Sequence, residues 1–173
     1  MAEGGPDRER QRVYDAEDGA FLDTTYAAPL GERGCRWLVA RLAAAPWWTA
    51  QGLPAPPVRA ARAASTRSTT VVAGDQVQLR IGPGMDQAHV LSHELGHVLA
   101  TANAGHGPRY RAGHLDVASV LLGRSGADRL AVHYARAGLQ VAGRRWPPPP
   151  DHGDGGLLAV WEARQALDAL RLR

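Results

Sequence analysis

Hydrophobic residues recur at helical spacing in several stretches of the chain. In residues 8–22 and 31–45, apolar side chains return every three or four positions, as they do on one face of an α-helix. The same pattern covers residues 87–102, 110–122 and 127–137, and glycine follows the last two of these stretches. The spacing therefore predicts five helices in this part of the chain.

Between the second and third predicted helices the pattern changes to that of short strands. Residues 58–63, 69–73 and 76–81 each fit a strand, and the last alternates cleanly between apolar and polar side chains. Gly74 and Asp75 suit a hairpin turn between the second and third strands. The order of helices, small sheet and helices predicts an α+β fold, with a small, mostly antiparallel sheet packed on helices.

The two ends of the chain differ from its middle. Residues 1–7 are predicted to be disordered and residues 8–146 to form the main domain, while the proline- and glycine-rich residues 147–156 are predicted to form a linker. Residues 157–173 read as an amphipathic helix with an apolar stripe. The stripe consists of Val160, Ala163, Leu167 and Leu170. We expect it to pack back on the core, and a partner-binding or dimer helix is the alternative.

Composition narrows the classes of protein that fit. The chain has 173 residues and a formal net charge of +3, but all 20 basic residues are arginine and they are scattered. Nucleic-acid binding is therefore disfavoured without being excluded. Cys35 is the single cysteine, so no internal disulfide framework forms. No apolar run suits a membrane span or a secretory signal, and we expect a cytoplasmic location.

Residues 93–97 carry the clearest chemical motif of the chain. They read His-Glu-Leu-Gly-His, within a strongly helical segment. Residues four apart share one face of a helix, so His93 and His97 can bind one metal ion, and zinc is the metal that this motif favours. Glu94 lies on the flank of the same face, where it can reach a water molecule without binding the metal.

A catalytic zinc site needs a third protein ligand, and the residues after His97 limit the choice. One extended form of the motif requires histidine where this chain has Asn103, and another requires a glutamate nearer than Glu162. His106, His114 and Asp116 remain. We favour His106 because it sits in a Gly- and Pro-bounded turn just past the helix. His114 is more typical of a surface residue, and Asp116 suits either a hydrogen bond to a ligand histidine or a surface charge.

The motif and the Gly105–Tyr110 segment, Gly-His-Gly-Pro-Arg-Tyr, together resemble the SprT-like zinc metallopeptidases. A family of short metallohydrolases from actinobacteria is similar over more of the chain, including the Arg-rich segment 7–17 and the segment 132–139. The resemblance implies a zincin-like fold, a zinc cofactor and His106 as the third ligand. The spacing from His97 to His106 is shorter than in the DNA-repair members, and the chain has no cysteine-rich ribbon. The resemblance therefore gives little support for a DNA-linked substrate of this chain.

The hypothesised hydrolysis of an amide bond gives roles to other residues, and the resemblance adds one for the strand before the motif helix. Glu94 would be the general base, and a phenol, Tyr134 or Tyr110, would stabilise the developing negative charge, although either ring also suits an ordinary core position. The strand that precedes the motif helix would be an edge strand that pairs with an extended peptide, with Gln78 and Arg80 beside the cleft.

Three functional hypotheses follow. The first is a zinc-dependent hydrolase that cleaves amide bonds in a protein or peptide substrate. The second is a metal-binding interaction protein with weak or no catalysis, which acts through its C-terminal helix. The third is a DNA-associated protease of the SprT type. The sequence leaves the substrate and the oligomeric state undetermined.

Overall fold

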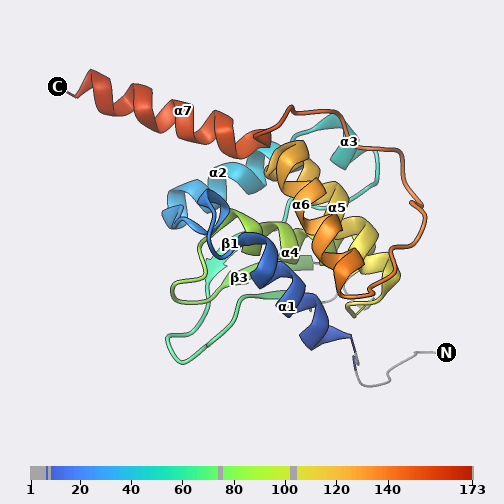
Figure 1. Cartoon of the computed structure of the whole chain (residues 1–173). Coiled ribbons are helices and arrows are strands. Elements are labelled where there is room, and N and C mark those ends of the chain that lie inside the picture. The colour runs from blue at the N-terminus through green and yellow to red at the C-terminus, as the bar shows by residue number, and fades with distance from the viewer. Residues whose placement is uncertain (1–6, 8, 74–75, 102–104, 173) are drawn as a thin grey trace.

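The computed structural model describes residue 7 and residues 9–73, 76–101 and 105–172. Within them the predicted α+β class is confirmed (Figure 1). The helices are α1 (Arg10–Phe21), the 3-10 helix η1 (Thr25–Ala27), α2 (Gly31–Ala43), α3 (Pro46–Thr49), α4 (Ala88–Ala100), α5 (Pro108–Leu121), α6 (Gly123–Arg136) and α7 (Gly156–Arg171). No helix among these residues is long and apolar enough to cross a membrane.

The sheet has three strands in the order β1-β3-β2, formed by Val58–Ala60, Gln76–Ile81 and Thr69–Ala73. Strand β2 pairs antiparallel with β3, but β1 pairs parallel with it, so the sheet is mixed rather than mostly antiparallel. Strand β3 is central and therefore cannot be the predicted edge strand. The edge that lies against α4 is β2. The predicted turn at residues 74–75 lies outside the described residues.

The apolar stripes of the first two helices form one side of the core, as the spacing predicted. Helix α1 buries Val13 and Phe21, and α2 buries Leu38 and Leu42, all four with no exposed surface. Full burial of such side chains contributes roughly 1.5–3 kcal/mol each. Helix α1 also buries one carboxylate on this face, that of Glu17.

Helices α4 and α5 cross at very close range, and the crossing depends on the glycine inside the motif. A Cβ atom added at Gly96 would lie 3.0 Å from the Cα atom of His114, and one added at Gly113 would lie 3.1 Å from the Gly96 carbonyl oxygen. Glycine at both positions therefore lets the two backbones meet. As a result, one face of α4 is covered by α5, and the motif histidines are held between α1 and α5.

The C-terminal helix packs on the body only through its first turns. Leu157, Leu158 and Trp161 are buried, whereas Val160, Leu167 and Leu170 are 51%, 57% and 67% exposed. Figure 1 shows α7 extending away from the other helices. The expectation that the Val160–Leu170 stripe packs on the core is wrong, because the side chains that meet the body lie one position away from it.

The proline-rich segment before α7 runs along the body instead of hanging free. The indole nitrogen of Trp47 donates to the Pro147 carbonyl oxygen at 2.8 Å, and the Arg124 amide donates to the Gly153 carbonyl oxygen at 2.9 Å. At its end, a Cβ atom on Gly156 would lie 2.3 Å from the Gly123 nitrogen, and both glycines have positive φ. This glycine contact fixes where α7 leaves the body.

Candidate metal centre

Helix α4 brings the two motif histidines together as predicted. The Nε2 atoms of His93 and His97 lie 3.3 Å apart on one face of the helix. His106 lies two residues before α5, and its Nε2 atom is also 3.3 Å from that of His93. The nitrogen atoms of all three residues lie within 4.8 Å of one another. The structure therefore brings together the three residues that the sequence singled out as ligands.

The spacing of these nitrogens fits a tetrahedral metal ion. Two nitrogens bound at about 2.0–2.1 Å to a zinc ion at the tetrahedral angle lie about 3.3–3.4 Å apart, which is the separation found here for both pairs. Without a cation or a shared proton, lone pairs that face each other at this distance repel. The donor set, three imidazoles, suits zinc and several other divalent transition metals.

Carboxylates from the N-terminal part of the chain hold two of the three ligands. Nδ1 of His93 lies 2.9 Å from both carboxylate oxygens of Glu17, and Nδ1 of His106 contacts Oδ2 of Asp7. If each Nδ1 carries the proton and donates it, each Nε2 presents its lone pair to the common centre. His97 instead stacks on the ring of Tyr110, with ring centroids 4.2 Å apart.

The surroundings set the protonation of the ligands. Burial lowers the pKa of His97 to about 2, with the positive charges of neighbouring histidines adding to the effect. Burial also lowers the pKa of His106 and outweighs its hydrogen bond with Asp7. For His93 burial acts in the same direction, but the Glu17 carboxylate outweighs it and raises the pKa. His97 and His106 are therefore neutral near pH 7, the form that binds a metal.

Glu94 is placed as the sequence predicted, beside the histidines and not among them. Its Oε2 atom lies 2.7 Å from the hydroxyl of Thr70 on strand β2, and that hydroxyl is 2.9 Å from the Glu94 backbone oxygen. Glu94 is only 4% exposed. Burial raises the pKa of its carboxyl group, although His93 and the hydrogen bond from Thr70 act in the opposite direction. A carboxylate with a raised pKa is suited to accept and return a proton near neutral pH.

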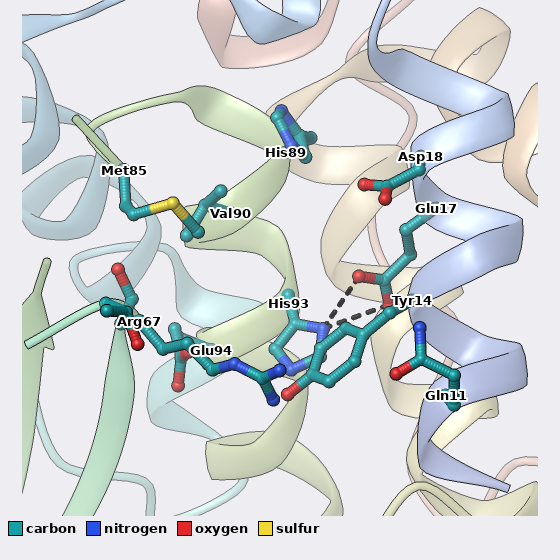
Figure 2. A pocket seen from close by; sticks show the side chains of 12 residues that line it. Gln11, Tyr14, Glu17, Asp18, Arg67, Met85, His89, Val90, His93 and Glu94 are labelled. Atoms are coloured by element: carbon teal, nitrogen blue, oxygen red, sulfur yellow. Dashed lines mark hydrogen bonds and ion pairs between the residues drawn. The ribbon is translucent and has the colours of Figure 1, made fainter.

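An open cleft lies beside these groups (Figure 2). His93 and Glu94 form part of its wall, together with Tyr14 and Arg67. The Tyr14 ring stacks on His93 at 5.3 Å with an angle of 22°, and the Arg67 guanidinium carbon lies 5.3 Å above the Tyr14 ring. His89 lines the far end of the cleft in the same view.

The residues expected beside the cleft from strand β3 are not there. Neither Gln78 nor Arg80 is among the described residues that line it. The reason is the strand order, since β2 lies between β3 and helix α4. The segment that leads into β2, residues 66–68, borders the cleft instead.

Behind His93 lies a second, closed group of polar side chains. The Ser92 hydroxyl donates to the His89 carbonyl oxygen at 2.7 Å, so it accepts from Nε2 of His114 at 3.0 Å. In the neutral ring Nδ1 of His114 is then an acceptor for the Tyr134 hydroxyl at 2.8 Å, and in the charged ring it faces Glu17 at 3.3 Å. Glu17, His93 and His114 could also hold a metal by their geometry; all three are buried, and only Glu17 and His93 of the three line the cleft.

The structure corrects the expectations for four residues. His114 is fully buried and hydrogen-bonded, so it is not a surface residue. Tyr134 and Tyr110 are fully buried too, so neither hydroxyl is open to a substrate, and the expected role of Tyr134 as a charge-stabilising donor is wrong. Asp116 does not support a ligand, because it accepts hydrogen bonds from Arg144 and Trp146.

Sequence reasoning missed Glu17, Asp7, Tyr14 and Thr70. Glu17 had a signal: a carboxylate occupies an apolar position of the α1 stripe, and a buried acid needs a partner. No local pattern marks Asp7 or Thr70. Both depend on contacts with distant parts of the chain.

Comparison of the chain with protein-family models finds no matching family. Comparisons with curated proteins and with solved structures find no match either.

Proposed function

We propose that this chain is a zinc-dependent hydrolase of the zincin-like type that cleaves amide bonds in a protein or peptide. One observation carries the proposal: the Nε2 atoms of His97 and His106 each lie 3.3 Å from that of His93, a separation that fits a tetrahedral metal ion, and His93 lines an open cleft together with the buried Glu94. His93, His97 and His106 would hold the metal. Bound zinc acts as a Lewis acid and brings the pKa of a water molecule to about 7.

The chemistry of the chain itself centres on Glu94. Its Oε2 atom is within hydrogen-bonding distance of Thr70, and the other oxygen, Oε1, is the atom that takes the proton from water. The same carboxyl group then gives the proton to the leaving amine. Thr70 fixes the orientation of the carboxylate. Because the raised pKa makes Glu94 a stronger base than an exposed glutamate, both transfers are favoured near neutral pH.

The cleft supplies the groups that meet the substrate. Strand β2 is an edge strand next to α4, where an extended peptide can add its backbone to the sheet. Tyr14 and Arg67 line the cleft and carry hydrogen-bond donors, so they take the role of stabilising the carbonyl oxygen that the sequence had given to Tyr134.

The first test is metal content. We expect about one zinc ion per wild-type chain, its loss in His106→Ala, and its retention in the matched control His152→Ala. Activity is then measured by mass spectrometry on a peptide library. We expect Glu94→Gln to keep its zinc and to lose activity by a factor of about 10²–10⁴, while Glu32→Gln on the exposed face of α2 stays active. A wild-type chain that binds no zinc contradicts the proposal.

The exposed outer half of α7 favours a second candidate, a metal-binding protein that acts through a partner. Leu167 and Leu170 lie on a helix that extends away from the body, where nothing in the described chain covers them. Glu94→Gln separates the two candidates. The cellular function of the Glu94→Gln variant would survive if the protein acts through a partner and would be lost if it is an enzyme. Leu167→Glu would have the opposite effect.

A further inference from the structure

The third ligand is held in a different way from the other two. His93 and His97 are fixed by the backbone of α4, whose register places both on one face. His106 lies outside any helix, in the segment between α4 and α5. Its position therefore has to come from contacts with other parts of the chain.

Those contacts come from the start of the described chain. Oδ2 of Asp7 accepts a hydrogen bond from the His106 backbone N–H at 3.1 Å and also contacts the Nδ1 atom of the ring. Nη1 of Arg111 donates to the His106 carbonyl oxygen at 2.7 Å and to Oε2 of Glu9 at 2.8 Å. We call Asp7, Glu9 and Arg111 the N-terminal clasp. It engages the N–H, the carbonyl and the ring nitrogen of His106.

The clasp is tied to the core at one end. Arg111 has no exposed surface, and its Nε atom donates to the Gln140 carbonyl oxygen at 2.7 Å. A buried guanidinium needs a compensating charge, and Glu9 supplies it. The other end is more accessible, since the Asp7 side chain is 29% exposed. Gly105 lies beside it, where a Cβ atom would be 3.5 Å from the Asp7 carboxylate, an ordinary van der Waals contact.

We propose that the N-terminal clasp positions His106, so that Asp7 and Glu9 belong to the metal centre although they lie far from the motif in the sequence. Asp7 is a positioning residue and does not bind the metal. Engagement of the clasp and binding of the metal then strengthen each other, as two linked equilibria must. An event that displaces Asp7 would weaken the binding of the metal. The inference rests on the proposed metal site.

The test measures zinc affinity by competition with a chromogenic chelator. Asp7→Ala is expected to weaken zinc binding 10- to 100-fold, the range typical of removing the partner of a ligand histidine. Asp7→Asn is expected to fall between Asp7→Ala and the wild type, because its amide oxygen still accepts hydrogen bonds but carries no charge. Asp15→Ala, which removes an exposed carboxylate on α1, is the matched control and should leave affinity unchanged.

A second readout follows the clasp itself. Hydrogen exchange of the His106 amide should be faster in Asp7→Ala than in the wild type without zinc, because its acceptor is gone. Zinc should slow the exchange in the wild type. The visible spectrum of the cobalt-loaded protein should change in Asp7→Ala and stay the same in Asp15→Ala, which separates a change in ligand geometry from a general loss of stability.

The possible outcomes separate a failure of the clasp proposal from a failure of the proposed metal site. If the wild type binds no zinc, the proposed function and the clasp both fail. If the wild type binds zinc and Asp7→Ala binds it as tightly as Asp15→Ala does, the clasp is refuted while the three-histidine site stands. Weaker binding in Asp7→Ala with an unchanged cobalt spectrum and unchanged exchange at His106 also refutes it.

Discussion

The contact between Glu17 and His93 gives a prediction that separates metal affinity from folding. Glu17 is buried, and both of its oxygens lie 2.9 Å from Nδ1 of His93. The substitution Glu17→Gln keeps the size of the side chain and one acceptor atom but removes the charge. His93 then loses the carboxylate that makes its Nε2 atom a stronger donor to a metal.

The expected magnitude follows from this geometry. Loss of the carboxylate partner of a ligand histidine weakens metal binding about 10- to 100-fold, which corresponds to about 1.4–2.7 kcal/mol. The metal-free protein is affected separately. A hydrogen bond with a charged partner contributes about 1.5–3 kcal/mol, so Glu17→Gln should lower the free energy of unfolding by an amount of this order at pH 7.

The pH dependence of the second effect has a definite sign. Burial acts to raise the pKa of Glu17, but His93 and His114 outweigh it and hold the pKa well below its ordinary value of 4.5. A depressed pKa stabilises the fold above pH 4.5, and this contribution declines as the pH falls below 4.5 toward the folded-state value. The difference in stability between the wild type and Glu17→Gln should therefore shrink in acid.

Urea denaturation of the metal-free proteins at pH 7 and at pH 3.5, with zinc titration at pH 7, measures both effects. Asp15→Asn on the exposed face of α1 is the control and should match the wild type in both. Zinc affinity in Glu17→Gln equal to that of the wild type would refute the reasoning that Glu17 supports the ligand. A stability difference that grows in acid would refute the assigned charge on Glu17.

Three further predictions test how side chains pack in different parts of the fold. Gly96→Val should lower the free energy of unfolding by about 1–3 kcal/mol in urea denaturation, because α5 must move away, whereas Gly143→Val, which faces open space, should have little effect. Cys35 is 1% exposed, and burial raises its pKa to about 12, so iodoacetamide at pH 8 should modify it only after unfolding, as read by mass spectrometry. Trp161→Ala should cost about 3–5 kcal/mol and Leu170→Ala less than about 0.5 kcal/mol, and equal effects would contradict the placement of α7.

Local spacing was enough to predict the elements that carry the ligands. The motif has a fixed helical register, so placing it on a helix also places His93 and His97 together. Strands 69–73 and 76–81 were predicted with their observed bounds, because β-branched residues in the first and alternation of apolar and polar side chains in the second are local signals. His106 could be anticipated because the turn that holds it is short and close to the helix end.

Contacts between distant segments could not be predicted in this way. His114 has the sequence surroundings of a surface residue, and it is buried only because α5 crosses α4 at Gly96. The apolar stripe of α7 predicted a helix but not its contacts. Those contacts depend on the close approach of Gly123 and Gly156, where the helix leaves the body. Tyr134 is fully buried because α6 packs on α1 and α5, which its local sequence does not reveal.

The three ligands differ in how firmly the fold holds them, and this difference says where the site can be controlled. His93 is fixed by α4 and by the buried carboxylate of Glu17, and His97 is fixed by α4 and by its stack on Tyr110. These two histidines are therefore in place once α4 has packed on its neighbours. His106 instead contacts a partly exposed aspartate 99 residues away, which we propose holds it in place. Because a metal ion bound by two imidazoles is held more weakly than one bound by three, metal loading should depend on Asp7 and Glu9 as well as on the residues of the motif.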